Sequence, residues 1–450
     1  MEFNSLSFIL LIMPIFVLLM YFIKNNLARN IIITIFSLLL YALSDLKYLL
    51  LILLISLLTY FVGLKVNKNK KLYYLYLIIV ILILSIFKYG NYFVSALQTL
   101  NIEKIIMPVG ISFYIFTSIA YVSDIYYGKI EADNNLVNII TFLTFFPTVT
   151  SGPILRYKPF KEYLDNKNIE LASMEAGFKR FVIGLFKKVV IANQVAVASN
   201  ICFGSDAKLS FILAWFGSLC FMLQLYYDFS GYSDMAIGIV KMIGFNIAEN
   251  FNDPYTALSI QDFWHRWHIS LSSWFRDYVY IPLGGNRVSH LRWLINTMIV
   301  WLLTGIWHGS TINYLFWGIW NGVFIALHKE FFSKLKLPKW LMWLLTQLVV
   351  MLGFTIFHTS GVNGLKTYLL ALIGKGESFS LIYIKQLDIL YLWFYIFLAI
   401  IFTIPFFKKI FYSIEKKANL LFDVIIIALL FISIVFIVSG SYSAFIYAGF

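Results

Sequence analysis

Charged residues are scarce in this sequence, and their scarcity excludes most classes of soluble protein. Asp, Glu, Lys and Arg make up 13% of the 450 residues and hydrophobic residues 61%, whereas soluble globular proteins carry about 25% charged and about 45–50% apolar residues. At roughly 20 residues for each membrane-crossing helix, the apolar residues suffice for about nine to twelve spans. We therefore predict an all-α polytopic integral membrane protein. Soluble enzymes, disordered chains and nucleic-acid-binding domains are excluded.

Cysteine is also rare. Cys202 and Cys220 both lie in apolar sequence, and their spacing matches no metal or redox motif, so we expect both to be buried in the core. A basic segment is missing before the first apolar run at residues 6–23, and we interpret this run as an uncleaved span. Aromatic residues are abundant at 19%, which suggests buried passages lined by aromatic rings.

The net charge of +13 is best explained by membrane topology. The links at residues 24–30 and 65–71 together hold six basic residues, while the link at 44–47 holds one. Because basic residues collect on the cytoplasmic side, we expect the first two links in the cytoplasm and the N-terminus outside. A second basic cluster is expected in the cytoplasm as well, which places the C-terminus outside: Lys408, Lys409, Lys416 and Lys417.

We expect one membrane domain over residues 1–450, with its catalytic portion at approximately 150–330, because ionisable residues gather there. Such residues are costly inside apolar segments and therefore informative. Gly152 and Pro153 interrupt an apolar run just before Arg156, which indicates either an interfacial turn or a broken helix that lines a cavity. The run at 136–150 and the runs beside His308 are short enough to be re-entrant.

Two acidic residues, Asp228 and Asp234, lie in the next polar segment, which apolar sequence flanks on both sides. We expect a buried network in which one of them pairs with an arginine, with direct catalysis as the alternative.

Residues 263–287 are the densest polar group. If residues 262–278 are helical, His265 and His268 are three apart and share a face. Two histidines alone do not make a metal site, and we predict none. Four residues make the segment too charged to face lipid, which places it at an interface or along a wet cavity: Arg266, Arg276, Asp277 and Arg287.

His308 stands alone in apolar sequence, within the motif TGIWHG at residues 304–309. The glycines permit close approach of a ligand or another backbone, and imidazole is well suited to moving a proton near neutral pH. His308 is therefore a candidate for proton transfer, with a hydrogen-bonded core histidine as the alternative.

These segments together resemble the membrane-bound O-acyltransferase (MBOAT) family, in particular its bacterial alginate and peptidoglycan O-acetyltransferase branch. The resemblance covers nearly the whole chain. It implies a bundle of about nine to twelve transmembrane helices with re-entrant segments around a central tunnel. The matching blocks are FNSLSF (3–8), PVGISFYIF (108–116), SGPILRY (151–157), QLYYDFSGYSDMAIG (224–238), FWHRWHISLSSWFRDYVYIPLGGNR (263–287) and TGIWHG (304–309).

The resemblance implies that His308 is the catalytic residue and that His268 is its partner across the tunnel. A neutral imidazole can remove the proton of an attacking hydroxyl and return a proton to a leaving thiolate. His268 or the Arg266 region is expected to donate hydrogen bonds to the oxyanion. Further residues expected to support the site or line the tunnel are Trp307, Arg266, Arg276, Asp277, Asp228 and Arg156.

The resemblance also implies O-acetylation of a cell-envelope or exported polysaccharide across the bacterial cytoplasmic membrane. Acetyl-CoA, or another acyl thioester, is the expected cytoplasmic donor, and no cofactor is expected to stay bound. An extracytoplasmic SGNH-type partner is expected to complete the transfer. The C-terminal FIYAGF departs at Ala448 and Gly449 from the FIYFQF of relatives. Tyr447 is expected to relay the acyl group, with an interfacial aromatic anchor as the alternative.

Two other functions stay open at this point. One is D-alanyl transfer to teichoic acid by the same fold, although IPLGGNR at residues 281–287 favours the acetylating branch. The other is a transporter or channel, because intramembrane histidines, acids and broken helices also serve transport pathways. The sequence contains no internal repeat with paired broken segments, which argues against transport.

Overall fold

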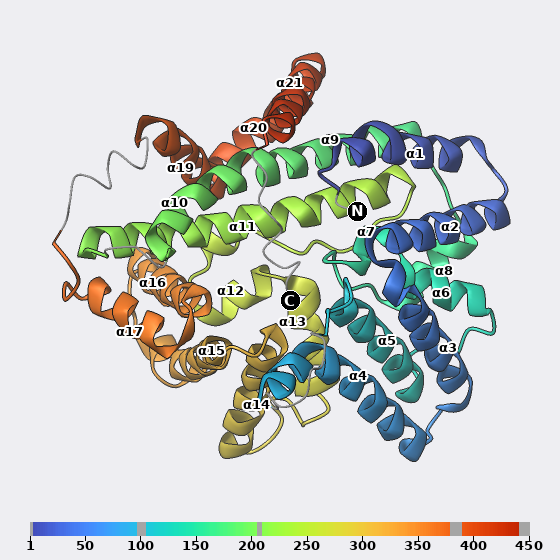
Figure 1. Cartoon of the computed structure of the whole chain (residues 1–450), viewed down its shortest axis with the longest axis horizontal. Helices are drawn as coiled ribbons and strands as arrows, with labels where there is room; N and C mark the ends of the chain where they lie inside the picture. Colours follow the sequence, from blue (N-terminus) through green and yellow to red (C-terminus); the bar gives the residue numbers. More distant parts are fainter. Residues whose placement is uncertain (1–2, 97–104, 205–208, 379–388, 441–450) are drawn as a thin grey trace. The chain divides into compact units, whose positions relative to one another are not determined.

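The computed structural model describes residues 3–96, 105–204, 209–378 and 389–440, in which the regular secondary structure is helical and no strand occurs (Figure 1). The predicted all-α architecture is confirmed. In these ranges six stretches of helix are long and apolar enough to cross a membrane, or seven if one bent pair counts as a span. The chain is thus a multi-pass membrane protein. The number is below the roughly nine to twelve expected, because some apolar runs form short helices such as the 16-residue α5 (Ile111–Tyr126).

The described residues divide into two compact units. Unit 1 comprises residues 3–181 and 232–249, and unit 2 comprises residues 182–231 and 250–440, apart from the gaps named above. The single membrane domain over residues 1–450 stays a prediction.

Unit 1 is a helical assembly around α5, which is buried from Ile111 to Ile125. Helix α3 packs against α5 and α6, and α2 packs against α6. The helices of unit 1 are α1 (Met13–Phe22), α2 (Asn26–Asp45), α3 (Leu49–Lys65), α4 (Lys70–Ala96), α5, α6 (Leu136–Thr144), α7 (Phe146–Val149), α8 (Tyr157–Asp165), most of α9 (Leu171–Phe186) and the end of α11 (Phe211–Met242).

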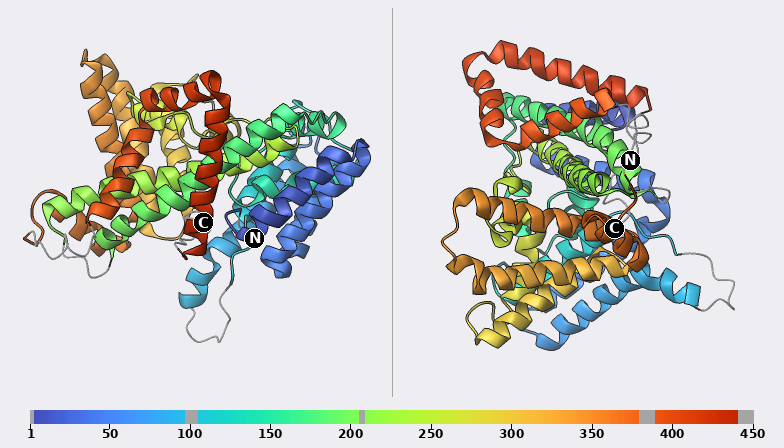
Figure 2. Two further views of the ribbon diagram at one scale, coloured as in Figure 1. Left: turned by 90° about the horizontal axis from the view of Figure 1, so that it is seen from above. Right: turned by 90° about the vertical axis from the view of Figure 1, so that its left-hand side faces the viewer.

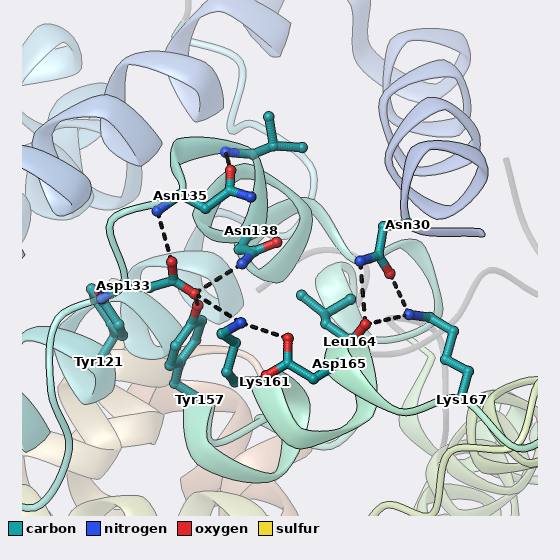
Figure 3. A network of polar contacts seen from close by, with 11 residues as sticks. Asn30, Tyr121, Asp133, Asn135, Asn138, Tyr157, Lys161, Leu164, Asp165 and Lys167 are labelled. Carbon is teal, nitrogen blue, oxygen red and sulfur yellow. Dashed lines mark hydrogen bonds and ion pairs between the residues drawn. The ribbon is translucent and has the colours of Figure 1, made fainter. Parts of the chain in front are cut away.

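A polar network around Asp133 fixes the loop before α6 to α8 (Figure 3). The carboxylate accepts hydrogen bonds from the Asn135 N–H (2.7 Å), the Asn138 amide (2.9 Å) and the Tyr157 hydroxyl, and Lys161 lies 3.7 Å away. Burial by itself raises the pKa of Asp133, but these donors and Lys161 outweigh it and hold the pKa below its usual range. The carboxylate is therefore charged at neutral pH and ties the two segments together.

Two buried basic side chains, Arg29 and Lys167, bond to carbonyl groups at helix C-termini in unit 1. Arg29 donates to the Met20 carbonyl in the last turn of α1 (2.9 Å). Lys167 donates to the Leu164 carbonyl in the last turn of α8 (2.9 Å) and to the Asn30 side chain (Figure 3). Because helix C-termini carry partial negative charge, a positive charge on either side chain is favourably placed. Burial, together with the charge of Arg29, lowers the pKa of Lys167 to about 7.

Unit 2 is organised around the antiparallel pair α14 and α15, which pack closely together, and α15 also contacts α12, α16 and α17. Figure 2 shows the C-terminal helices in red, where the chain bends by 83° between α19 and α20 and then turns into α21. Besides most of α11, the helices of unit 2 are α10 (Asn193–Phe203), α12 (Ile260–Arg266), α13 (Ile269–Phe275), α14 (His290–His308), α15 (Ile312–Glu330), α16 (Lys339–His358), α17 (Gly361–Leu372), α19 (Ile389–Thr403), α20 (Pro405–Lys417) and α21 (Asn419–Val438).

The apolar runs on either side of Asp228 and Asp234, at residues 209–227 and 231–247, are not separate spans. They form one helix, α11, which continues through the polar residues between them. Asp228 is neutralised by Lys188, and Gly231 packs so closely that a β-carbon there would lie 2.8 Å from the Gly184 carbonyl oxygen. Because the charge of Asp228 is paired and Gly231 permits close packing, the polar segment can remain part of a continuous helix.

Candidate active site

His308 is the last residue of α14 and is 3% exposed. Aromatic rings surround its imidazole: the centroids of Trp307, Trp317 and Phe357 lie 4.6, 4.9 and 5.0 Å from its own. Trp307, a predicted supporting residue, is itself buried. The histidine therefore lies in an enclosed and largely apolar environment, where a proton-transfer group is shielded from bulk water.

Two glycines of the TGIWHG motif create the tight turn at His308. A β-carbon at Gly305 would lie 2.5 Å from the carbonyl oxygen of Tyr314 in α15. Gly309 has a φ of 152°, and a β-carbon there would lie 2.8 Å from the Tyr314 ring. Neither contact is possible for a larger residue without a shift, so the glycines determine how closely the two helices meet around His308.

His268 lies at a break between two short helices. Helix α12 ends at Arg266, α13 begins at Ile269, and His268 itself has left-handed backbone angles, with φ 45° and ψ 53°. The continuous helix predicted over residues 262–278 is therefore wrong. The shared face is wrong as well, because His265 is exposed whereas His268 is 2% exposed.

Asn250 is a hydrogen-bonding partner of His268 that sequence reasoning missed. Its Oδ1 lies 3.3 Å from Nδ1 of His268, and it accepts hydrogen bonds from the Ser270 N–H (3.1 Å) and hydroxyl (3.0 Å). The ring of Phe229 meets the His268 imidazole edge-on at 4.6 Å. Asn250 lies in a polar loop outside every motif, so no pattern distinguished it from an ordinary loop residue.

Burial lowers the pKa of His268 to about 3. The cause is desolvation, since a charged imidazolium is costly away from water. His268 is therefore a neutral imidazole throughout the physiological pH range.

A series of aromatic contacts within unit 2 connects the surroundings of the two histidines. Trp267 stacks on Phe263 (5.5 Å), Phe263 contacts Trp264 (5.1 Å), and Trp264 contacts Trp317 (5.6 Å), which packs on His308. Aromatic rings thus contact one another between the RWH and WHG motifs, while the buried passage that such rings were expected to line stays a prediction. The tunnel itself stays a prediction.

The charged residues predicted to support the site form ion pairs close to their own positions. Arg266 pairs with Asp262 one turn earlier (2.8 Å) and donates to the Asn252 carbonyl (3.4 Å). Arg276 pairs with the adjacent Asp277 (2.8 Å), and the Arg276 side chain is 61% exposed. These contacts give all three residues a structural role, and their catalytic roles stay predictions.

The acidic residues of α11 are paired, as predicted. Asp234 pairs with Arg180 at 2.8 Å, which confirms the expected arginine partner. Asp228 pairs instead with Lys188, and both of these side chains are 3% exposed. Removing one member of such a pair leaves an uncompensated buried charge and costs about 3–5 kcal/mol.

The last two predicted site residues lie elsewhere. Arg156, in unit 1, directly precedes α8 and has extended backbone angles. The segment from residue 151 to residue 156 is irregular, so the predicted break in the apolar run is present. Tyr447 lies outside the described residues. Within the described residues, no group of three or more His, Cys, Asp and Glu side chains is placed to hold a metal ion.

These observations define a class: a multi-pass, all-helical membrane protein with two buried histidines in an aromatic environment. Comparison with known proteins identifies the class more closely. The sequence model of the membrane-bound O-acyltransferase family matches residues 127–370, a range that includes both histidines. The chain belongs to this family and is an acyltransferase, as its motifs predict.

Individual relatives agree with the family assignment. A probable alginate O-acetylase of Pseudomonas syringae pv. tomato is 36% identical over 381 residues, which is 81% of this chain and 73% of the relative. A peptidoglycan O-acetyltransferase of Helicobacter pylori is 33% identical over 422 residues, 83% of this chain and 80% of the relative. A teichoic acid D-alanyltransferase of Bacillus subtilis is 31% identical over 259 residues, 53% of this chain and 63% of the relative.

Proposed function

We propose that this protein is an O-acetyltransferase of the bacterial cytoplasmic membrane that serves the acetylation of a cell-envelope or exported polysaccharide. The observation that carries the proposal is the placement of His308, buried at the end of α14 among aromatic rings, inside the segment that matches the family. Relatives named for alginate and peptidoglycan acetylation are similar over about four fifths of the chain.

His308 acts as the base in this proposal. The acceptor oxygen attacks the thioester carbonyl, its proton passes to the imidazole, and the departing thiolate takes up a proton. An enclosed apolar environment supports this role, because it keeps competing water from the thioester. General acid–base catalysis by a positioned side chain contributes about 10²–10⁴-fold to a rate.

The donor is acetyl-CoA or another acyl thioester, used from the cytoplasm. The basic links and the cluster at Lys408, Lys409, Lys416 and Lys417 support a cytoplasmic placement of these segments, with both termini outside. An extracytoplasmic SGNH-type protein accepts the acyl group and completes the transfer to the glycan. Tyr447 in the external tail relays the acyl group to that partner.

The identity of the ester-linked group tests the proposal. We expect envelope or exported glycans from cells that express the protein to release acetate in mild base, and glycans from a deletion strain to release none. Release of D-alanine would indicate the teichoic acid reaction instead. Substrate transport without any change in ester content would indicate a transporter. Undiminished acetate from a Tyr447→Phe strain would remove the relay role of Tyr447 and leave the rest of the proposal in place.

A further inference from the structure

The segment that contains His268 is held against the loop at residues 250–252. The Ile269 N–H donates to the Asn250 carbonyl (3.0 Å), and the Asn252 N–H donates to the Arg266 carbonyl (2.9 Å). Main-chain hydrogen bonds therefore flank His268 on both sides. They hold its left-handed backbone conformation, which is strained in a non-glycine residue and persists only where the surroundings determine it.

The orientation of the Asn250 amide follows from its partner Ser270. Oxygen and nitrogen of an asparagine amide are exchanged by a simple flip, and the hydrogen-bond network decides between the two. The Ser270 main-chain N–H can only donate, and it points to the atom placed as Oδ1 at 3.1 Å. That atom must therefore be the oxygen, because the amide NH₂ cannot accept.

The oxygen in turn determines which nitrogen of His268 carries the proton. Nδ1 of His268 lies 3.3 Å from Oδ1 of Asn250, and two acceptors cannot bond to each other, so Nδ1 carries hydrogen. A neutral imidazole has one N–H and one lone pair. Nε2 of His268 therefore presents the lone pair.

We infer that Asn250 is a positioning residue that holds His268 as the Nδ1–H tautomer, so that His268 offers a hydrogen-bond acceptor at Nε2. Asn250 is fully buried (0% exposed), which keeps water from competing for the same hydrogen bond. This replaces the expectation that His268 donates a hydrogen bond to the oxyanion, since a neutral imidazole of this tautomer has no proton on Nε2. The tautomer follows from the hydrogen-bond geometry together with the burial that keeps the imidazole neutral, whereas its use in acyl transfer rests on the proposed function.

Nitrogen-15 NMR of histidine tests the inference in the full-length protein. The protein is produced with ¹⁵N-labelled histidine and reconstituted in lipid nanodiscs, and His268→Gln identifies the signals of His268 among the six histidines. At neutral pH we expect a protonated Nδ1 and an unprotonated Nε2. Asn250→Asp and Ser270→Ala should keep this tautomer, because both retain an acceptor oxygen at position 250 and the Ser270 N–H.

Asn250→Leu removes the acceptor with little change in volume. It should shift His268 toward the Nε2–H tautomer and lower kcat about 10²-fold with KM unchanged, and Asn250→Asp should restore the tautomer. A wild-type His268 protonated on Nε2, or an Asn250→Leu spectrum identical to that of the wild type, would overturn the inference.

If Asn250→Leu does not fold, the spectra of the wild type, Asn250→Asp and Ser270→Ala still decide which tautomer His268 adopts. If wild-type protein forms no ester at all, the proposed function fails while the NMR result stands.

Discussion

At the residue scale, burial distinguishes the two motif histidines from their neighbours. His308 and His268 are buried, while His265 and His290 are exposed, although His265 and His268 lie in the same polar segment of the sequence. His290 forms a hydrogen bond with Glu330 (2.8 Å), which connects the start of α14 to the end of α15. An exposed pair of this kind has a structural role, and His290 therefore serves as a matched control for His308.

Asp133 shows how a buried carboxylate stabilises unit 1. We expect Asp133→Asn to lower the free energy of unfolding by about 1–3 kcal/mol, because hydrogen bonds to a charged acceptor are lost. The pKa of Asp133 is depressed in the folded state, so the stabilisation is present at neutral pH and is lost as the pH falls through the folded pKa. The difference between variant and wild type should therefore shrink below about pH 4, as measured by thermal unfolding in detergent.

The control for this prediction is Asp165→Asn. Asp165 pairs with Lys161 at 2.6 Å, but its side chain is 54% exposed, and exposed pairs contribute about 0–1 kcal/mol. Equal destabilisation by the two substitutions, or a loss in Asp133→Asn that does not change with pH, would contradict the role of the network.

Sequence reasoning identified some site residues and missed others for physical reasons. His308 stands out because a titratable group flanked by glycines is costly in an apolar segment. One of Asp228 and Asp234 was expected to pair with an arginine, and Asp234 does so. Lys188, the partner of Asp228, is 40 residues away in the chain, and Asn250 contacts His268 only because a loop folds against a helix break. Contacts of this kind depend on tertiary structure, so the local sequence around either residue contains no pattern that predicts them.

At the scale of elements, helix boundaries were the least predictable feature. The break at His268 occurs in HRWHISLSS, which contains neither glycine nor proline, and hydrogen bonds to the loop at residues 250–252 create it. Conversely, α11 continues through a polar segment because Lys188 neutralises Asp228. In both places tertiary partners overrode the local preference of the sequence.

The close approach of α14 and α15 leads to a prediction about Gly305. We expect Gly305→Ala to destabilise the protein by about 1–3 kcal/mol and to lower acyl transfer, because the added methyl group would lie 2.5 Å from the Tyr314 carbonyl and separate the helices around His308. Gly364→Ala is the control: Gly364 lies in α17, and a β-carbon added there would meet no atom within 4 Å. Thermal unfolding and the ester assay measure both effects. Wild-type behaviour of Gly305→Ala would contradict the account of this helix contact.

At the scale of the whole molecule, the scarce charges fall into two groups. One group consists of basic links, which predict the cytoplasmic side of the membrane. The other lies within unit 2 and unit 1 as neutralised pairs, such as Lys188 with Asp228 and Arg180 with Asp234. The overall composition predicted an all-helical membrane protein correctly. The sequence motifs identified the family. Only the tertiary structure identified the individual residues that pair with the charged side chains.

The central claim is that His308 carries acyl transfer from a cytoplasmic thioester to a glycan outside. It is tested most directly in sealed inverted membrane vesicles that enclose the acceptor glycan and receive acetyl-labelled acetyl-CoA on their outer, cytoplasmic face. The vesicles also enclose the extracytoplasmic partner that completes the transfer. Base-labile label should accumulate in the glycan of vesicles with the wild type and with His290→Ala, and fall by about 10²-fold or more with His308→Ala. Equal labelling with His308→Ala and the wild type would contradict the claim.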